Sequence, residues 1–212
     1  MTLPVKYGLA VLASITLIVL SLTQKIPYAW TDAVTFVTGA WYVWLISRQS
    51  MWAWAVGAAN AVFTGVVMWR LQLPLDTGLQ GMYFLFMIAG AFLWSRKTEG
   101  ATEVPIRTLS VTGWMAALAV GALGVIALLP IGKKLGSALP TLDASLTSFS
   151  LVAQFLTSYK YIENWLFWIG LNLVYIPLLW VRDARLVSVL YFVYLVLAVV
   201  GYLDWKKSTP RA

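Results

Sequence analysis

The chain contains no cysteine and no histidine among its 212 residues, and only 11% of its residues are charged. Without cysteine it can form no disulfide and offers no thiol nucleophile, and without histidine it lacks the most common general base and metal ligand. An enzyme of the membrane would need a cluster of Asp, Glu, His or Cys near one interface, and the eight acidic residues of the whole chain are too sparse to supply one. The sequence therefore predicts a protein that is not an enzyme and uses no metal or cofactor.

Apolar residues are what the chain has in abundance. They make up 61% of it, and its mean hydropathy is +0.81, which is far above the values of soluble domains. A helix needs about 20 residues to cross roughly 30 Å of hydrocarbon. By that measure the chain has apolar segments at 4–23, 30–46, 51–69, 79–94, 109–130, 143–159, 164–181 and 186–205. The sequence predicts an all-α polytopic membrane protein with eight spans.

Basic residues divide unequally between the two sides of the membrane if all eight segments span it. The side of the N-terminus carries nine of the 15, namely Lys6, Arg48, Arg96, Lys97, Arg107, Lys160, Lys206, Lys207 and Arg211. The other side carries the remaining six, namely Lys25, Arg70, Lys133, Lys134, Arg182 and Arg185. Since cytoplasmic loops are enriched in Lys and Arg, this excess predicts that both termini are cytoplasmic.

The acidic residues within reach of the spans lie at segment ends. Asp32 and Asp143 open two of the apolar segments. We expect them to be N-caps, where the helix dipole favours a negative charge; the alternative is a contact with the substrate. No chain of ionisable groups crosses the predicted spans. The sequence therefore favours passive, selective diffusion over proton-coupled transport.

An internal repeat appears when the chain is compared with itself at a shift of 111 residues, which places residues 30–97 on 141–208. The shift aligns Asp32 with Asp143, Trp54 with Trp165, Trp69 with Trp180, Tyr83 with Tyr194, Gly90 with Gly201 and Trp94 with Trp205. An ancestral duplication explains these matches; the alternative is that interfacial tryptophans recur at membrane spacing.

Each copy holds three apolar segments, and a single segment between them returns the second copy to the membrane in the orientation of the first. Such parallel repeats are a transporter architecture with substrate bound where the copies face one another. We therefore divide the chain into a peripheral N-terminal helix (1–29), a first three-helix bundle (30–97), a linker helix with its loops (98–140), a second three-helix bundle (141–208) and a tail (209–212).

Uncharged amides lie inside the predicted spans, at Asn60, Gln80, Gln154 and Asn172. Any one of them could join two helices through a hydrogen bond, a common use of amides in membranes. Together they come from both copies, as a shared central cavity requires. Amides both donate and accept hydrogen bonds, so they suit a ligand with hydroxyl or carboxamide groups.

Aromatic residues accompany these amides. Trp165, Trp168 and Asn172 follow one face of a helix, at positions i, i+3 and i+7. Facing Tyr83 and Tyr194, the indoles could stack on a flat heteroaromatic ring, and more strongly on a cationic one. The alternative is a place in the aromatic belt at the membrane surface, which applies most to Trp165. These eight residues are the predicted substrate-binding set.

The chain resembles the PnuC family of vitamin transporters. The resemblance depends on the pattern W-x-x-W-x-x-x-N at Trp165, Trp168 and Asn172, on SLVAQFLTSYKYIEN at 150–164, on LQGMYF at 79–84 and on LYFVYLVLAVVGYLDW at 190–205. It covers the chain from about residue 30 onward.

The resemblance implies a SWEET-like fold of two three-helix bundles joined by a linker helix, with an additional N-terminal helix, assembled as a homotrimer in the bacterial inner membrane. It also implies facilitated diffusion of nicotinamide riboside, which cytoplasmic phosphorylation then traps. Relatives that carry thiamine or riboflavin keep those vitamins open as alternatives, and a structural membrane protein is the alternative from another class. Under the 111-residue shift Trp168 falls on Gly57 and Asn172 on Ala61, so the site is expected to be asymmetric.

Overall fold

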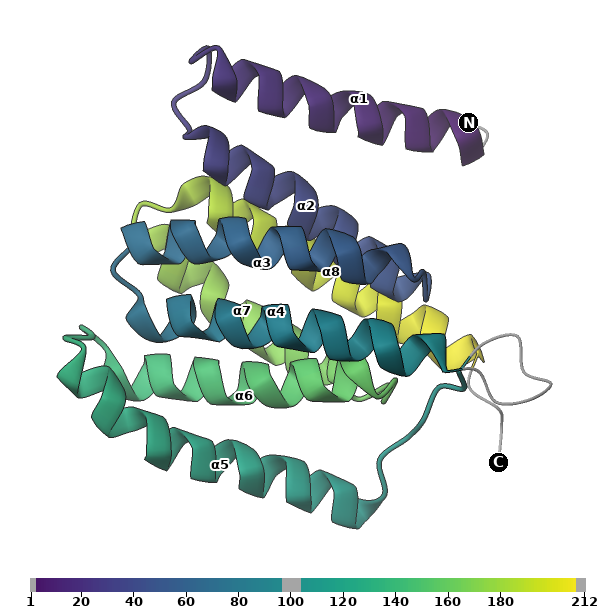
Figure 1. Ribbon diagram of the computed structural model, residues 1–212, viewed down its shortest axis with the longest axis vertical. Helices are drawn as coiled ribbons and strands as arrows, with labels where there is room; N and C mark the ends of the chain where they lie inside the picture. The colour runs from purple at the N-terminus through teal and green to yellow at the C-terminus, as the bar shows by residue number, and fades with distance from the viewer. Residues whose placement is uncertain (1–2, 97–103, 209–212) are drawn as a thin grey trace.

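The computed structural model describes residues 3–96 and 104–208, which form eight α-helices and no β-strand longer than a single bridge (Figure 1). They are α1 (Leu3–Leu22), α2 (Trp30–Ser47), α3 (Trp52–Arg70), α4 (Pro74–Ser95), α5 (Val111–Lys134), α6 (Pro140–Ser158), α7 (Asn164–Val181) and α8 (Arg185–Ser208). The all-α prediction is confirmed for this part of the chain. Lys97, Arg211 and the predicted tail lie outside the described residues.

Proline and left-handed turns set the ends of several helices. Pro74 and Pro140 occupy the first helical positions of α4 and α6, where the missing N–H costs nothing. In the turns between helices, positive φ angles of 55–57° occur at Gln49, Gln72, Lys160 and Asp183. The 111-residue shift places Gln49 on Lys160 and Gln72 on Asp183, so the turns of the two sequence copies have matching backbone conformations.

The helix bounds agree closely with the predicted segments except in α4, which begins at Pro74 instead of residue 79. The polar stretch Asp76-Thr77-Gly78 lies inside the helix, because the proline starts it and the acid lies in its first turn. The expectation that Asp32 and Asp143 are N-caps is wrong. Their helices begin at Trp30 and Pro140 with Ala29 and Leu139 as the N-cap residues, so both acids lie within the first helical turn.

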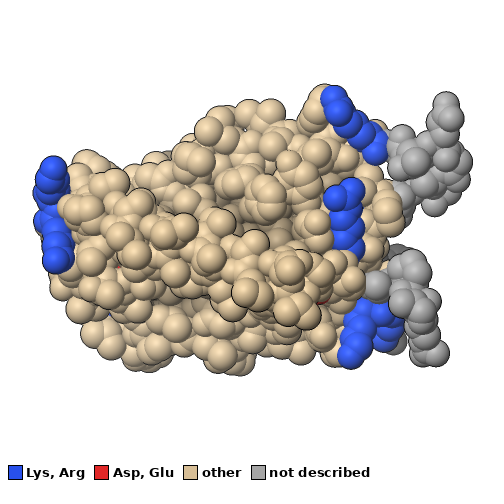
Figure 2. Space-filling view, turned by 90° about the horizontal axis from the view of Figure 1, so that it is seen from below, with Lys and Arg blue, Asp and Glu red and all other residues tan. Residues whose placement is uncertain are grey.

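Five helices are long and apolar enough to cross a membrane, namely α3, α4, α5, α7 and α8, and α1 contains the shorter apolar stretch Ala10–Leu22. Helix α6 is less apolar because it is enclosed by other helices: Thr147, Ser150, Gln154 and Thr157 are all buried. Figure 2 shows the visible Lys and Arg side chains at two opposite ends of the molecule, with a broad uncharged surface between them. This distribution fits a multi-pass membrane protein.

The helices pack in a symmetric order. Helices α2, α3 and α4 pack in sequence, as do α6, α7 and α8, and the two groups meet where α2 packs on α8 and α4 packs on α6. The shift that moves α2 onto α6 also moves α4 onto α8, so these two junctions correspond. In Figure 1, α1 covers the outer side of α2 at one edge and α5 covers the outer side of α6 at the other.

A cluster of tryptophans fills the core at one end. Trp54 meets Trp94 edge to face, with ring centroids 5.0 Å apart at 88°, and Trp165 meets Trp205 in the same way at 5.4 Å and 85°. Trp94 and Trp205 approach each other at 6.3 Å across the two groups of helices. Edge-to-face pairs of this kind are a favoured aromatic geometry.

Candidate functional site

A cavity of about 80 Å³ lies between the two groups of helices, lined by α2, α3 and α4 on one side and α6, α7 and α8 on the other. Such a volume has room for several water molecules. All eight residues predicted from the sequence line it, namely Asn60, Gln80, Tyr83, Gln154, Trp165, Trp168, Asn172 and Tyr194. Their role in binding a substrate stays a prediction.

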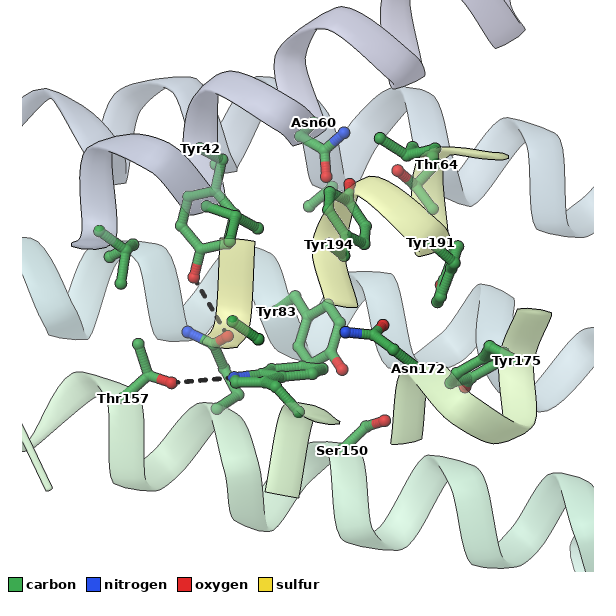
Figure 3. A pocket seen from close by; sticks show the side chains of 18 of the residues that line it. Tyr42, Asn60, Thr64, Tyr83, Ser150, Thr157, Asn172, Tyr175, Tyr191 and Tyr194 are labelled. Carbon is green, nitrogen blue, oxygen red and sulfur yellow. Dashed lines mark hydrogen bonds between the residues drawn. The ribbon is translucent and has the colours of Figure 1, made fainter. Parts of the chain in front are cut away.

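Helix α7 presents its predicted face to this cavity. Trp165, Trp168, Asn172 and Tyr175 line the cavity at successive spacings of three and four residues, the period of one helix face. The indole N–H of Trp168 donates to the Thr157 hydroxyl over 3.2 Å. This bond fixes the plane of the ring. Figure 3 shows Tyr83 and Asn172 directed toward one another beside the indole bonded to Thr157.

Trp168 and Tyr83 form an aromatic pair in the cavity. Their ring centroids are 6.2 Å apart at an interplanar angle of 66°, and they come from α7 and α4. Trp165 has a different position: it is 2% exposed, and its ring lies where a Cβ on Gly201 would be 2.6 Å away. Trp165 is therefore part of the tryptophan core at the end of the cavity and not of an aromatic belt at the lipid surface.

Two of the four amides join helices. The Asn60 amide nitrogen donates to the Thr35 carbonyl over 3.0 Å and to the Thr38 hydroxyl over 3.1 Å, which links α3 to α2. The Gln154 side-chain oxygen accepts a hydrogen bond of 3.2 Å from the Tyr42 hydroxyl, across the two groups of helices. The Gln154 amide nitrogen has no partner among the described residues, so it can still donate to a ligand.

The other two amides are free to bind. Gln80 is 7% exposed and Asn172 is 3% exposed, and both line the cavity. Neither side chain forms a side-chain hydrogen bond within residues 3–96 and 104–208. The two buried amides therefore retain donors and acceptors for a polar ligand. Leaving them unpaired costs free energy that a ligand can recover.

Several cavity residues were missed by the sequence reasoning. Tyr42, Thr157, Tyr175 and Tyr191 line the cavity, and Asp76 lies directly behind Tyr175, whose hydroxyl donates to its carboxylate over 2.6 Å. The signal was present on α4, because Asp76, Gln80 and Tyr83 follow one helix face. The predicted segment begins only at residue 79, so it does not include Asp76.

Two indole hydrogen bonds join the halves at the end of the molecule where α2 and α6 finish. The Trp94 indole N–H donates to the Ser158 carbonyl over 3.0 Å, and the Trp205 indole N–H donates to the Ser47 carbonyl over 3.2 Å. Each bond satisfies a carbonyl in the last turn of a helix, where no backbone partner exists. The 111-residue shift exchanges one bond for the other, and we call this pair the tryptophan latch.

Lys160 reinforces the same end. Lys160 is 2% exposed. Its ammonium donates to the Gln49 side-chain oxygen and to the Val104 carbonyl over 2.8 Å each. The same ammonium nitrogen lies 4.4 Å from the Trp94 ring centroid. The backbone of Arg107 pairs with the turn between α6 and α7 through bonds of 2.8 and 2.9 Å. The segment that leads into α5 is thereby attached to the latch.

Comparison with known proteins gives one family. The model of the family described as nicotinamide mononucleotide transporter matches residues 7–207. A protein of Haemophilus influenzae named nicotinamide riboside transporter PnuC is 27% identical over 190 residues, which cover 87% of this chain and 83% of that protein.

A riboflavin/roseoflavin transporter of Streptomyces davaonensis, RibM, is 26% identical over 189 residues, covering 86% of this chain and 87% of that protein. Among solved structures, the crystal structure of the vitamin B3 transporter PnuC aligns with a TM-score of 0.77 at 25% identity, covering 94% of this chain and 91% of that one. The helical arrangement described above is therefore similar to that of a solved vitamin transporter.

Proposed function

Because the chain belongs to the nicotinamide mononucleotide transporter family, whose model matches residues 7–207, we propose that it carries nicotinamide riboside across the membrane by facilitated diffusion. The family is one of transporters and not of enzymes. The relative from Haemophilus influenzae, which is named for this substrate, covers most of the chain.

The observation that carries the proposal is the pairing of aromatic rings with free amides in one cavity. Nicotinamide riboside has a flat pyridinium ring with a permanent positive charge, a carboxamide and ribose hydroxyls. Trp168 and Tyr83 offer ring faces for the cation, at about 0.5–2 kcal/mol each. Asn172 and Gln80 are free to pair with the carboxamide or the hydroxyls, and the Gln154 amide nitrogen offers a further donor.

Transport in this proposal is a rocking motion of the halves 30–97 and 141–208. The fold is the SWEET-like arrangement, with all eight helices spanning the bacterial inner membrane and both termini in the cytoplasm. Figure 1 shows the start of α1 and the end of α8 at the same end of the molecule, as an even number of spans requires. The tryptophan latch then closes the cytoplasmic end, and phosphorylation of the vitamin after release keeps the gradient directed inward.

We further propose that the protein functions as a homotrimer. The lipid-facing candidates for the contact between copies are α1 and α5, whose outer faces expose large apolar side chains such as Ile15, Val19, Leu123 and Ile126. Crosslinking in the membrane followed by mass determination tests this assembly.

A thermal-shift screen of the purified protein tests the substrate. Nicotinamide riboside at about 100 times its dissociation constant is expected to stabilise the protein by about 2.7 kcal/mol. Trp168→Ala and Asn172→Ala should then lower uptake of labelled nicotinamide riboside into proteoliposomes. Unaltered uptake in both variants would remove these residues from the binding site.

Riboflavin is the second candidate, because RibM is 26% identical to the chain over 86% of its length. Riboflavin is also flat and polar at its edges, but it carries no permanent charge. Including riboflavin and thiamine in the same screen decides between the three vitamins, since the true substrate gives the largest shift at equal concentration.

A further inference from the structure

Asp76 is a buried acid beside the cavity that no part of the transport scheme uses. It lies in the first turn of α4 and is 3% exposed. Its Oδ1 accepts the hydrogen bond of the Tyr175 hydroxyl over 2.6 Å, and its Oδ2 has no hydrogen-bond partner among the residues described. An ionisable group within a membrane-spanning helix is costly unless function requires it.

No salt bridge joins Asp76 to a basic side chain of residues 3–96 or 104–208; the ion pairs there are Arg70–Asp32, Arg185–Asp183 and Lys207–Asp204. The N-terminal end of α4 favours a negative charge at this position through its dipole. The dipole of α4 and the Tyr175 hydroxyl together stabilise the Asp76 carboxylate in part, as a counter-ion would.

Tyr175 connects Asp76 to the cavity. Its ring lines the cavity and is followed by Tyr191 at a centroid distance of 4.8 Å and then by Tyr194, which lies 5.3 Å from Tyr191. In Figure 3, Tyr175 lies next to Asn172 on the same helix. A cation stacked in the cavity would therefore be separated from the carboxylate by a single tyrosine side chain.

The other half of the molecule has no acid at the corresponding position. The 111-residue shift places Asp76 on Val187, which is also buried, and Tyr175 on Thr64. The duplicated scaffold thus accommodates an apolar residue where α8 begins. The acid occurs in the first half alone, and through Tyr175 it contacts α7, the helix that carries Trp168 and Asn172.

We propose that Asp76 is the residue that makes the site select cationic substrates, with its carboxylate acting through Tyr175 as the counter-ion of the bound pyridinium. This inference rests on the proposed function and names the charge class of its substrate. In a site of low polarity, a fixed charge one side chain away changes the affinity for a cation strongly and leaves that for a neutral ligand of the same shape almost unchanged.

The test compares nicotinamide riboside with its reduced dihydropyridine form, which has nearly the same shape and no charge. Dissociation constants of both are measured for the full-length protein and for Asp76→Asn. Asparagine keeps the size of the side chain and can still accept the Tyr175 hydrogen bond. We expect Asp76→Asn to weaken binding of the cation by about tenfold or more and that of the reduced form by less than about twofold.

The matched control is Asp32→Asn at the same end of the molecule. Asp32 already pairs with Arg70, so its removal should leave the ratio of the two dissociation constants unchanged. An Asp76→Asn protein in which both ligands bind as in the wild type, or in which both weaken equally, would overturn the inference and leave the proposed function intact. A wild-type protein that binds riboflavin but neither nicotinamide riboside nor thiamine would instead refute the proposed substrate, and with it a role for Asp76 in cation selection.

Discussion

Removal of the tryptophan latch should open the cavity toward the end at which α2 and α6 finish. Trp94→Phe and Trp205→Phe each keep an aromatic ring and delete one N–H donor, so each breaks one hydrogen bond between the halves. A hydrogen bond of this kind contributes about 0.5–1.5 kcal/mol net. The double variant should shift the equilibrium between the closed and open states by about 1–3 kcal/mol, which is roughly 5- to 150-fold.

The absence of native cysteine makes the assay simple. Ser150 is 1% exposed and lines the cavity, and Ser150→Cys changes one atom and introduces the only thiol of the chain. A membrane-impermeant thiol reagent is added to vesicles from one side or the other. The rate of labelling from the latch side should rise in each single variant and should rise further in the double variant, because each substitution deletes a separate hydrogen bond.

Trp180→Phe is the matched control, since Trp180 is 55% exposed and lies at the opposite end of α7 from the latch. It should leave both labelling rates unchanged. Equal labelling from the two sides in the double latch variant would mean general loosening and not the opening of one gate. A labelling rate equal to that of the parent protein would show that the two indole bonds do not hold the closed state.

Two further predictions use contrasts within one helix or one residue type. Gly90→Ala should lower the free energy of unfolding by about 1–3 kcal/mol, because its Cβ would lie 2.1 Å from the Trp54 ring. Gly81→Ala in the same helix would place its Cβ with nothing within 4 Å and should stabilise α4 by up to about 1 kcal/mol. Equal melting temperatures for the two variants would contradict the packing argument. Asn60→Ala should destabilise the protein by about 1–2 kcal/mol, because it loses its hydrogen bonds to α2. Asn172→Ala should preserve the melting temperature and lower the uptake of nicotinamide riboside. The reverse outcome would exchange the roles of the two residues.

The sequence predicted the family and the helices because both depend on local patterns. The family model's match over residues 7–207 confirms the resemblance read from Trp165, Trp168 and Asn172. Segment bounds follow from apolar length, so most were accurate to within a few residues. The start of α4 was not, since the proline that initiates it precedes a polar turn whose acid is bonded to Tyr175 of α7 in the folded protein.

Contacts between distant segments were beyond the reach of the sequence. Four intramembrane amides look alike in one dimension, but Asn60 has partners on α2 whereas Asn172 faces the cavity. The latch could not be predicted either, because its acceptors are backbone carbonyls, which are present at every residue. Only the packing of α4 on α6 and of α2 on α8 brings Trp94 and Trp205 to the correct ones.

The two halves carry the same residues in the latch and different residues at several positions in and beside the cavity. The latch uses the same residues twice, since Trp94 corresponds to Trp205 and Ser47 to Ser158, and its two bonds are equivalent. In and beside the cavity, by contrast, Trp168 corresponds to Gly57, Asn172 to Ala61, Tyr175 to Thr64 and Asp76 to Val187.

A rocking motion acts equally on both halves, so a gate works best when both halves contribute the same bond. A nucleoside has no two-fold symmetry, and a ring on one side with a sugar on the other requires different side chains from each half. Different side chains at these corresponding positions are therefore what an asymmetric substrate such as a nucleoside would require of two similar halves.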